Sequence, residues 1–323
     1  MAFALASVST QRGRAYTVNN NLVSNARALV VCFYPNRELL LDLVKRLCTQ
    51  VSDVWILDNG GIEAGLEREL RTYSNLCIHA FESNVGIAAA LNYGFELAAQ
   101  DEVEFVVTFD QDSQPDENHV SILLQAWKTL AQQGIHKVGA IGPSFFDDRG
   151  KVVQFPFFQT HGLKVKKIYH QAGCSEVLVD VLITSGMLVP VSMWREGLKF
   201  RDELFIDLVD SEWCFRATAA GYSHFGCFSV RMRHHCSDAE TTKVIGLRLL
   251  QYNPMRRYYY FRNSLYVSAR SYVPLAHKFR ILMGLVVRLL SMPFIDEAPT
   301  ISLAYALRGL RDGMLGNSGK MER

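Results

Sequence analysis

Two aspartates, one residue apart, end the apolar run in Val106-Val107-Thr108-Phe109-Asp110-Gln111-Asp112-Ser113-Gln114-Pro115. An apolar, β-branched run of this kind predicts a buried strand, which would bring both carboxylates to the carboxyl edge of a sheet. Open α/β folds bind ligands at this edge, and paired carboxylates there favour a divalent cation shared with a substrate phosphate. The alternative interpretation is an aspartate-rich turn that caps a helix starting near Pro115.

The chain around this stretch alternates strand and helix signals. An unbroken apolar run predicts a strand at 29–34, and further strands are predicted at 54–57, 77–81, 105–109 and 138–141. The segments between them carry apolar residues about one turn apart, as amphipathic helices do. Strands that alternate with helices at this spacing indicate an α/β, Rossmann-like fold with a mainly parallel sheet flanked by helices.

The alternation loosens after residue 142. Strands are expected at 177–183 and 230–235, and a loop entering a helix at 202–221, whereas residues 240–312 are expected to be mostly helical. The predicted organisation has four parts: a flexible extension at 1–25, two halves of one α/β domain at 26–142 and 143–240, and a helical region at 241–323.

The composition excludes several classes of protein. The 323 residues are 49% hydrophobic and 20% charged, which suits a globular protein with a sizeable core. A net charge of +2 gives no field that favours nucleic acid. The seven cysteines include no Cys-x-x-Cys pair, so we expect a reducing compartment. Without a signal peptide or a spanning segment, the protein is expected to be cytoplasmic.

Two further segments place polar or small residues at the expected ligand edge. Asp58 closes a predicted strand, where its carboxylate can bind a base or ribose, although an Asn-Gly turn explains the same position. Gly86, Ala90 and Gly94 form a ridge of small residues along the next helix, whose start offers N–H groups to a phosphate. Tight packing needs the same small residues. Asn92 would need a partner for its amide there.

An acidic block follows at 205–212. Asp207 and Asp210 would share a helix face beside bulky apolar groups, where a carboxylate can be tuned toward general-base work. Helix capping by either aspartate, together with a Glu212–Arg216 pair, explains the same pattern.

Histidine and arginine signals complete the set. His234 ends an alternating strand and could bind a metal, although adjacent histidines are more often a surface pair. Arg256 and Arg257 begin a run of arginines and aromatics that could clamp a diphosphate and stack on a base. Arginines that snorkel to an interface are the alternative.

In this order, the motifs resemble the inverting family 2 glycosyltransferases of GT-A fold, and most closely their bacterial rhamnosyltransferase branch for O-antigen precursors or rhamnolipids. The resemblance runs from residue 29 to residue 263 and is most specific at 110–113 and 205–212. It implies transfer of L-rhamnose from dTDP-β-L-rhamnose to a hydroxyl of a glycan or lipid-linked acceptor, with Mg²⁺ or Mn²⁺. The donor contacts it implies are Asp58, Asn84, Gly86, Asn92, Asp110, Arg256 and Arg257.

The resemblance also implies the remaining roles. Residues 26–142 would be the nucleotide-sugar-binding half of the domain, and residues 143–240 its acceptor or catalytic half. Asp112 and His234 would hold the metal. Asp210 aligns with the catalytic base, and Asp207 is its rival because Val209 replaces the usual glutamate before Asp210. The residues implied on the acceptor side are Ser185, Gly186 and Glu212.

A lipid-linked acceptor raises the question of a membrane. Residues 278–294 mix basic and apolar side chains, which suits a helix lying on the inner face of the cell membrane. A buried helix or a homodimer contact explains the same pattern. Other functions consistent with the motifs are transfer from a UDP-linked sugar and sugar-nucleotide binding without catalysis. A nucleotidyltransferase is disfavoured, because Tyr34-Pro35-Asn36-Arg37 stands where a Gly-rich loop would be needed.

Overall fold

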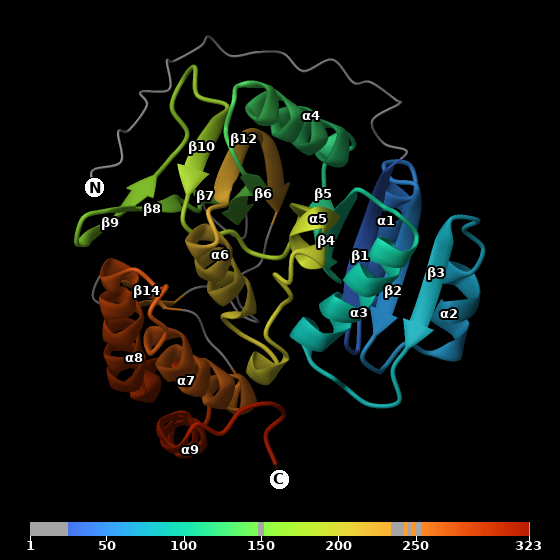
Figure 1. Ribbon diagram of the computed structural model, residues 1–323. Helices are drawn as coiled ribbons and strands as arrows, with labels where there is room; N and C mark the ends of the chain where they lie inside the picture. Colours follow the sequence, from blue (N-terminus) through green and yellow to red (C-terminus); the bar gives the residue numbers. More distant parts are fainter. Residues whose placement is uncertain (1–24, 148–151, 234–241, 245–246, 250–252, 323) are drawn as a thin grey trace.

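The computed structural model describes residues 25–147, 152–233, 242–244, 247–249 and 253–322. The predicted extension at 1–25, except its last residue, and His234 lie outside these ranges. One large sheet occupies the centre of the molecule (Figure 1). Its strands lie in the order β10 (Glu176–Val179), β12 (Ser223–Arg233), β6 (Val138–Asp147), β11 (Met187–Pro190), β4 (Phe105–Asp110), β1 (Ala26–Cys32), β2 (Asp53–Asp58) and β3 (Leu76–Ala80).

Helices cover both faces of the sheet, because successive strand residues point to opposite sides. Val30 and its face-mates pack against α1 (Arg37–Leu47), α2 (Ala64–Leu70) and α4 (His119–Gln132). Leu29 packs instead with α3 (Ile87–Gln100), α5 (Val191–Arg195) and α6 (Val209–Ala219). The predicted α/β architecture is confirmed.

The small-residue ridge on α3 serves packing. A Cβ atom added to Gly94 would lie 2.6 Å from Cδ1 of Leu29 and 3.0 Å from Cδ1 of Leu57, so α3 lies directly on β1 and β2. The amide of Asn92 has the partners that its position requires: its Nδ2 donates to the carbonyl of Phe200 at 2.9 Å, and its Oδ1 accepts from the N–H of that residue at 2.9 Å. Asn92 therefore ties α3 to the chain that leads into the acidic block.

One of the short strands that the sequence analysis missed sets the geometry of the site. β11 runs antiparallel to β4, and the N–H of Gly186, just before it, donates to the carbonyl of Thr108 at 2.6 Å. The start of β11 therefore lies at the carboxyl end of β4. The remaining strands are short: β5 (Gln114–Pro115), β7 (Val153–Gln154), the hairpin β8 (Phe157–His161) and β9 (Lys164–Ile168), and the pair β13 (Thr242–Val244) and β14 (Leu247–Leu249).

The C-terminal region is helical beyond residue 253 and lies to one side of the sheet, orange to red in Figure 1. It contains α7 (Pro254–Ser268), α8 (Leu275–Ile295) and α9 (Pro299–Leu315). The prediction of a mostly helical region is confirmed beyond residue 253, whereas strands β13 and β14 precede its first helix. Pro293 does not end its helix, since α8 continues to Ile295. None of the helices in the described ranges is long and apolar enough to cross a membrane.

Candidate active site

The two aspartates of the opening stretch lie in an anchored turn at the end of β4. The side chain of Gln111 accepts from the N–H of Phe33 at 2.7 Å and donates to its carbonyl at 3.2 Å, which joins the turn to the end of β1. The hydroxyl groups of Ser113 and Ser185, both buried, lie 2.6 Å apart. Helix α4 begins only at His119, so neither aspartate caps it, and the capping interpretation does not hold.

The acidic block forms a strained loop. Phe205, Asp207 and Leu208 have φ angles of 64°, 63° and 63°, a left-handed conformation that side chains rarely adopt. Asn263 on α7 stabilises it: its Nδ2 lies 2.9, 2.7 and 2.9 Å from the carbonyl oxygens of Leu204, Ile206 and Asp207.

The neighbouring Arg262 supports this clamp. Its guanidinium donates to the carbonyls of Glu203 and Leu204 at 3.1 and 3.0 Å, and its Nε donates to Oδ1 of Asn263 at 3.0 Å, which orients the amide. Arg262 and Asn263 are both buried. Neither was predicted as a site residue, because only the folded loop brings the carbonyl groups to them.

Four carboxylates and one arginine form the electrostatic centre. Burial, followed by the charge of Asp112, raises the pKa of Asp110 to about 7, and Arg256 opposes this rise. Burial raises the pKa of Asp210 to about 6. Two hydrogen bonds from Ser211 oppose this rise, whereas the negative charges of Asp110 and Asp207 add to it. These charge–charge interactions show that one cluster contains Asp110, Asp112, Asp207, Asp210 and Arg256.

The two candidate bases differ in their partners. Asp207 Oδ1 forms an ion pair with Nη2 of Arg256 at 3.2 Å, whereas its Oδ2 is buried and has no hydrogen-bond partner within the described ranges. Asp210 lies in the first turn of α6, and its Oδ1 accepts from the N–H of Ser211 at 2.6 Å. No arginine or lysine within the described ranges forms an ion pair with Asp210, which distinguishes it from Asp207.

Two predicted site residues serve the structure instead. Glu212 is fully buried: it accepts from Arg216 at 2.8 Å and from Tyr272 at 2.5 Å, so the helix-pair interpretation is correct and the acceptor-side assignment does not fit. Arg257 is also fully buried and pairs with Asp296 at the end of α8, so its charge is directed away from the carboxylate cluster.

The start of α3 is occupied by protein groups. The N–H groups of Val85, Gly86 and Ile87 donate to Asn59 Oδ1 at 3.1 Å, Asn84 Oδ1 at 2.9 Å and the carbonyl of Phe205 at 2.8 Å. These three N–H groups are therefore engaged by protein acceptors, so any N–H group that α3 offers to a phosphate would come from later in its first turn. A Cβ added to Gly86 would lie 2.7 Å from the oxygen of Phe205, so a glycine is needed where the acidic loop meets α3.

A pair of exposed aromatic rings was missed by the sequence analysis. Phe33 and Tyr34, directly after β1, are 48% and 73% exposed, and their ring centroids lie 4.7 Å apart. The N–H of Tyr34 donates to the carbonyl of Gly60 at 2.8 Å, and Asp58 Oδ1 accepts from the N–H of Gly60 at 2.8 Å. The turn interpretation of Asp58 is thus correct, and the turn holds Asp58 beside a surface on which a base can stack.

The side chain of His119 supports the backbone of the site at Gly186. This buried side chain lies 3.0 Å from the carbonyl of Gly186, and burial lowers its pKa to about 4, so it is neutral at pH 7. Within the described ranges, no three acidic, histidine or cysteine side chains are arranged to hold a metal. Asp110 and Asp112 supply the carboxylate oxygens that Mg²⁺ and Mn²⁺ prefer, and the rest of a coordination shell would come from a diphosphate and water.

The raised pKa of Asp110 predicts a stability effect. Because this carboxyl holds its proton more tightly in the folded protein than in the unfolded chain, the free energy of unfolding decreases as pH rises from about 4 to about 7. In EDTA at pH 8, Asp110→Asn should therefore melt higher than wild type by about 2 °C or more, and the difference should shrink at pH 4. Differential scanning fluorimetry measures both. A variant equally destabilised at both pH values would contradict the electrostatic origin.

The chain is similar to known glycosyltransferases. The family model "Glycosyl transferase family 2" matches residues 28–171. The dTDP-rhamnosyl transferase RfbF of Shigella flexneri is 28% identical over 254 residues, which are 78% of this chain and 82% of that protein.

Two solved structures share the fold. S. aureus TarS 1-349 in complex with UDP-GlcNAc has a TM-score of 0.54 at 14% identity, over 91% of this chain and 81% of that one. GalNAc-T7 with UDP, GalNAc and Mn²⁺ has a TM-score of 0.53 at 10% identity, over 82% of this chain and 55% of that chain's length. The family match over residues 28–171 and the similarity to RfbF support glycosyltransferase family 2, and the fold is that of the GT-A glycosyltransferases.

Proposed function

We propose that this glycosyltransferase moves L-rhamnose from dTDP-β-L-rhamnose to a hydroxyl of a cell-envelope glycan or glycolipid, with inversion at the anomeric carbon. The similarity to a relative named dTDP-rhamnosyl transferase supports the donor. One observation carries the mechanism: the Asp210 carboxylate, without a cationic partner in the described ranges, lies in the same cluster as the Asp110–Asp112 pair.

Asp210 is the proposed base. With a pKa of about 6 it is ionised at pH 7, yet it is more basic than an ordinary carboxylate. It would take the proton of the acceptor hydroxyl as that oxygen bonds to the anomeric carbon. The bond from this carbon to the diphosphate oxygen breaks on the opposite face, and dTDP leaves. Asp207, whose negative charge is paired with Arg256, is proposed to orient the donor sugar or the acceptor through its Oδ2.

The donor would lie along the carboxyl edge of the sheet. Asp58, Phe33 and Tyr34 are proposed to hold the base, and Asn84 and Gly86 to lie along the ribose and diphosphate. Asp112, assisted by Asp110, would hold Mg²⁺ or Mn²⁺, with His234 as a further ligand. A bound cation would offset the charge of the diphosphate, and Arg256 would contribute to the same balance. Ser185 and Gly186 would line the acceptor side from the start of β11.

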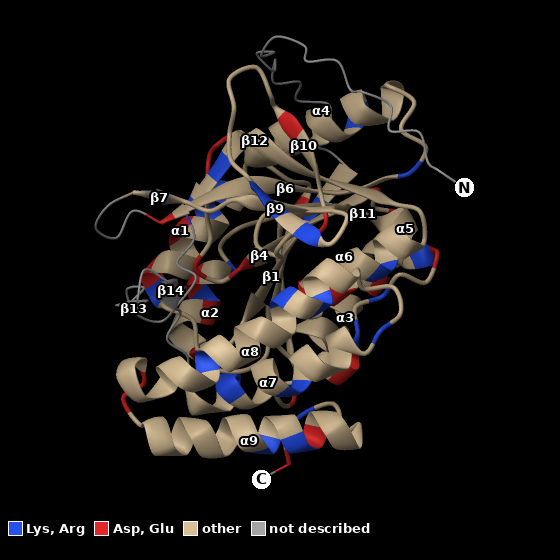
Figure 2. Ribbon diagram, turned by 90° about the vertical axis from the view of Figure 1, so that its left-hand side faces the viewer, with Lys and Arg blue, Asp and Glu red and all other residues tan. Residues whose placement is uncertain are grey.

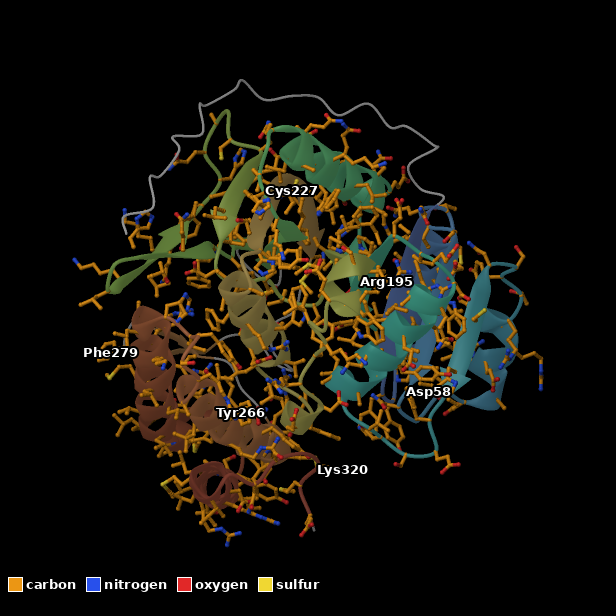
Figure 3. All side chains as sticks on the ribbon, viewed as in Figure 1. Asp58, Arg195, Cys227, Tyr266, Phe279 and Lys320 are labelled. Atoms are coloured by element: carbon orange, nitrogen blue, oxygen red, sulfur yellow. The ribbon has the colours of Figure 1, made fainter. Side chains whose placement is uncertain are left out.

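We also propose that α8 rests on the inner face of the cell membrane. Phe279, Leu290 and Phe294 are 69%, 70% and 75% exposed, and Figure 3 shows Phe279 at the outer edge of α8. The residues of α8 include Lys278, Arg280 and Arg288 but no acid. Figure 2 shows α8 and α9 side by side and largely uncharged. An apolar face with basic residues suits an anionic lipid surface, where a lipid-linked acceptor would lie.

Nucleotide binding tests the donor. With Mg²⁺ or Mn²⁺, dTDP should raise the melting temperature more than UDP or GDP, because the proposed donor carries dTDP. A ligand at a hundred times its Kd adds about 2.7 kcal/mol to the free energy of unfolding, which a melting curve resolves. Asp112→Asn should abolish the part of the shift that depends on the cation. A larger shift with UDP would reject rhamnose and retain a glycosyltransferase. No shift with any nucleotide would reject the donor site.

Replacement of the base tests catalysis. Asp210→Asn should lower kcat about a hundredfold or more while the Kd of dTDP changes little, because the carboxylate acts on the acceptor proton. In wild type, kcat should fall on the acid side with an apparent pKa at or below about 6, since a cation near Asp110 lowers it further. Near-wild-type turnover of Asp210→Asn would reject it as the base, and Asp207→Asn is then the variant to compare.

Vesicle binding tests the membrane proposal. The wild-type protein should sediment with phosphatidylglycerol vesicles at low salt, and the double variant Phe279→Ser, Leu290→Ser should not, because it loses apolar insertion. Leu178→Ser, at an exposed position on β10, is the matched control and should bind normally. Absence of vesicle binding together with a homodimer that Phe279→Ser dissociates would assign this face to a dimer instead.

A further inference from the structure

The C-terminal tail returns to the candidate active site. Gly316, with φ of 79°, ends α9, and the N–H of Asn317 donates to the carbonyl of Asp312 at 2.8 Å, which reverses the chain. The following residues run past one end of α7, and the chain then turns away to the C label at the bottom of Figure 1.

Backbone hydrogen bonds fasten the tail to the groups that hold the acidic loop. The N–H of Gly319 donates to the carbonyl of Glu203 at 2.7 Å, and its own carbonyl accepts from Nη1 of Arg262 at 2.5 Å. The N–H of Met321 donates to the hydroxyl of Tyr259 at 2.9 Å. Arg262 therefore binds the tail and the loop with one guanidinium, and the two segments share a single anchor.

Between these two anchored residues stands Lys320. Its Nζ donates to the carbonyl of Asn84 at 3.1 Å, so the tail reaches from the helical region to the turn before α3. Figure 3 labels Lys320 at this position. The residue is exposed, and no carboxylate within the described ranges forms an ion pair with it. An ammonium group has three protons to donate, and the carbonyl of Asn84 uses one.

We infer that Lys320 is a further donor-binding residue, which the tail delivers to the phosphate groups of a nucleoside diphosphate. This inference rests on the proposed function, in which Asn84 lines the donor. A neutral carbonyl does not balance a positive charge, whereas a diphosphate beside Asn84 would. The hydrogen bonds of Gly319 and Met321 restrict the backbone on both sides of Lys320, so little backbone freedom is lost when its ammonium binds the phosphate.

The test compares a diphosphate with a nucleoside. By calorimetry with Mg²⁺, Lys320→Gln should weaken dTDP binding about tenfold, the size of a charge-assisted hydrogen bond, and leave thymidine binding within about twofold. Lys320→Arg should retain most of the dTDP affinity. Lys45→Gln, which removes an exposed lysine of α1, is the matched control and should change neither.

Each outcome decides a different claim. Unchanged dTDP affinity in Lys320→Gln, or an equal loss for dTDP and thymidine, would overturn the inference and leave the proposed function standing. If wild type prefers UDP or GDP, the proposed donor is wrong, and the same comparison with that diphosphate and its nucleoside still decides the role of Lys320. Absence of binding by every nucleotide would overturn both.

A second variant tests the role of the tail. Proline at position 319 has no N–H for Glu203 and cannot adopt the φ of 80° found there, so Gly319→Pro should displace Lys320 without removing its charge. We expect the dTDP affinity to fall as in Lys320→Gln. Wild-type affinity in Gly319→Pro would show that the tail does not position the lysine.

Discussion

The buried Arg262–Asn263 pair is the interaction on which the candidate site depends. Each non-glycine residue in a left-handed conformation costs about 1–3 kcal/mol, and the acidic loop holds three of them within four positions. The Asn263 amide and the Arg262 guanidinium offset this strain by hydrogen-bonding the loop carbonyls. Because both residues come from α7, the C-terminal helices are part of the site. Asn253, which caps α7 at the N–H of Arg256, fixes where that helix begins.

The carboxylate cluster explains why such support is needed. Asp110 and Asp210 both have raised pKa values, so their mutual repulsion and desolvation oppose folding near neutral pH. Arg256 compensates for only part of this charge. Residues arranged for chemistry often lower the stability of a fold, and the surrounding structure has to supply the difference. Here the hydroxyl pair of Ser113 and Ser185 joins the end of β4 to the start of β11, and the neutral His119 contacts Gly186. None of these contacts adds charge.

The sequence predicted the first half of the fold, in which strand and helix alternate. Strands β1, β2 and β4 are mainly apolar runs separated by amphipathic helices, a pattern that follows from burial on both sheet faces. Strand β11 escaped notice because its four residues, Met187–Pro190, show no period, and no local signal tells that it runs antiparallel. Its direction comes from the tertiary arrangement. That direction brings Ser185 to the end of β4, so the missed strand determines where the two halves of the site meet.

Within the site, the order of the motifs along the sequence predicted the carboxylate cluster, but not which residue of each motif belongs to it. Adjacent helical residues point about 100° apart, since an α-helix has 3.6 residues per turn. Arg256 therefore meets Asp207 while Arg257 meets Asp296 on the other side of α7. In the same way, Asp210 belongs to the cluster while Glu212, two positions later, binds Arg216 inside the protein. A run of like residues predicts that a helix contributes to a site, and only the packing of that helix decides which of them does.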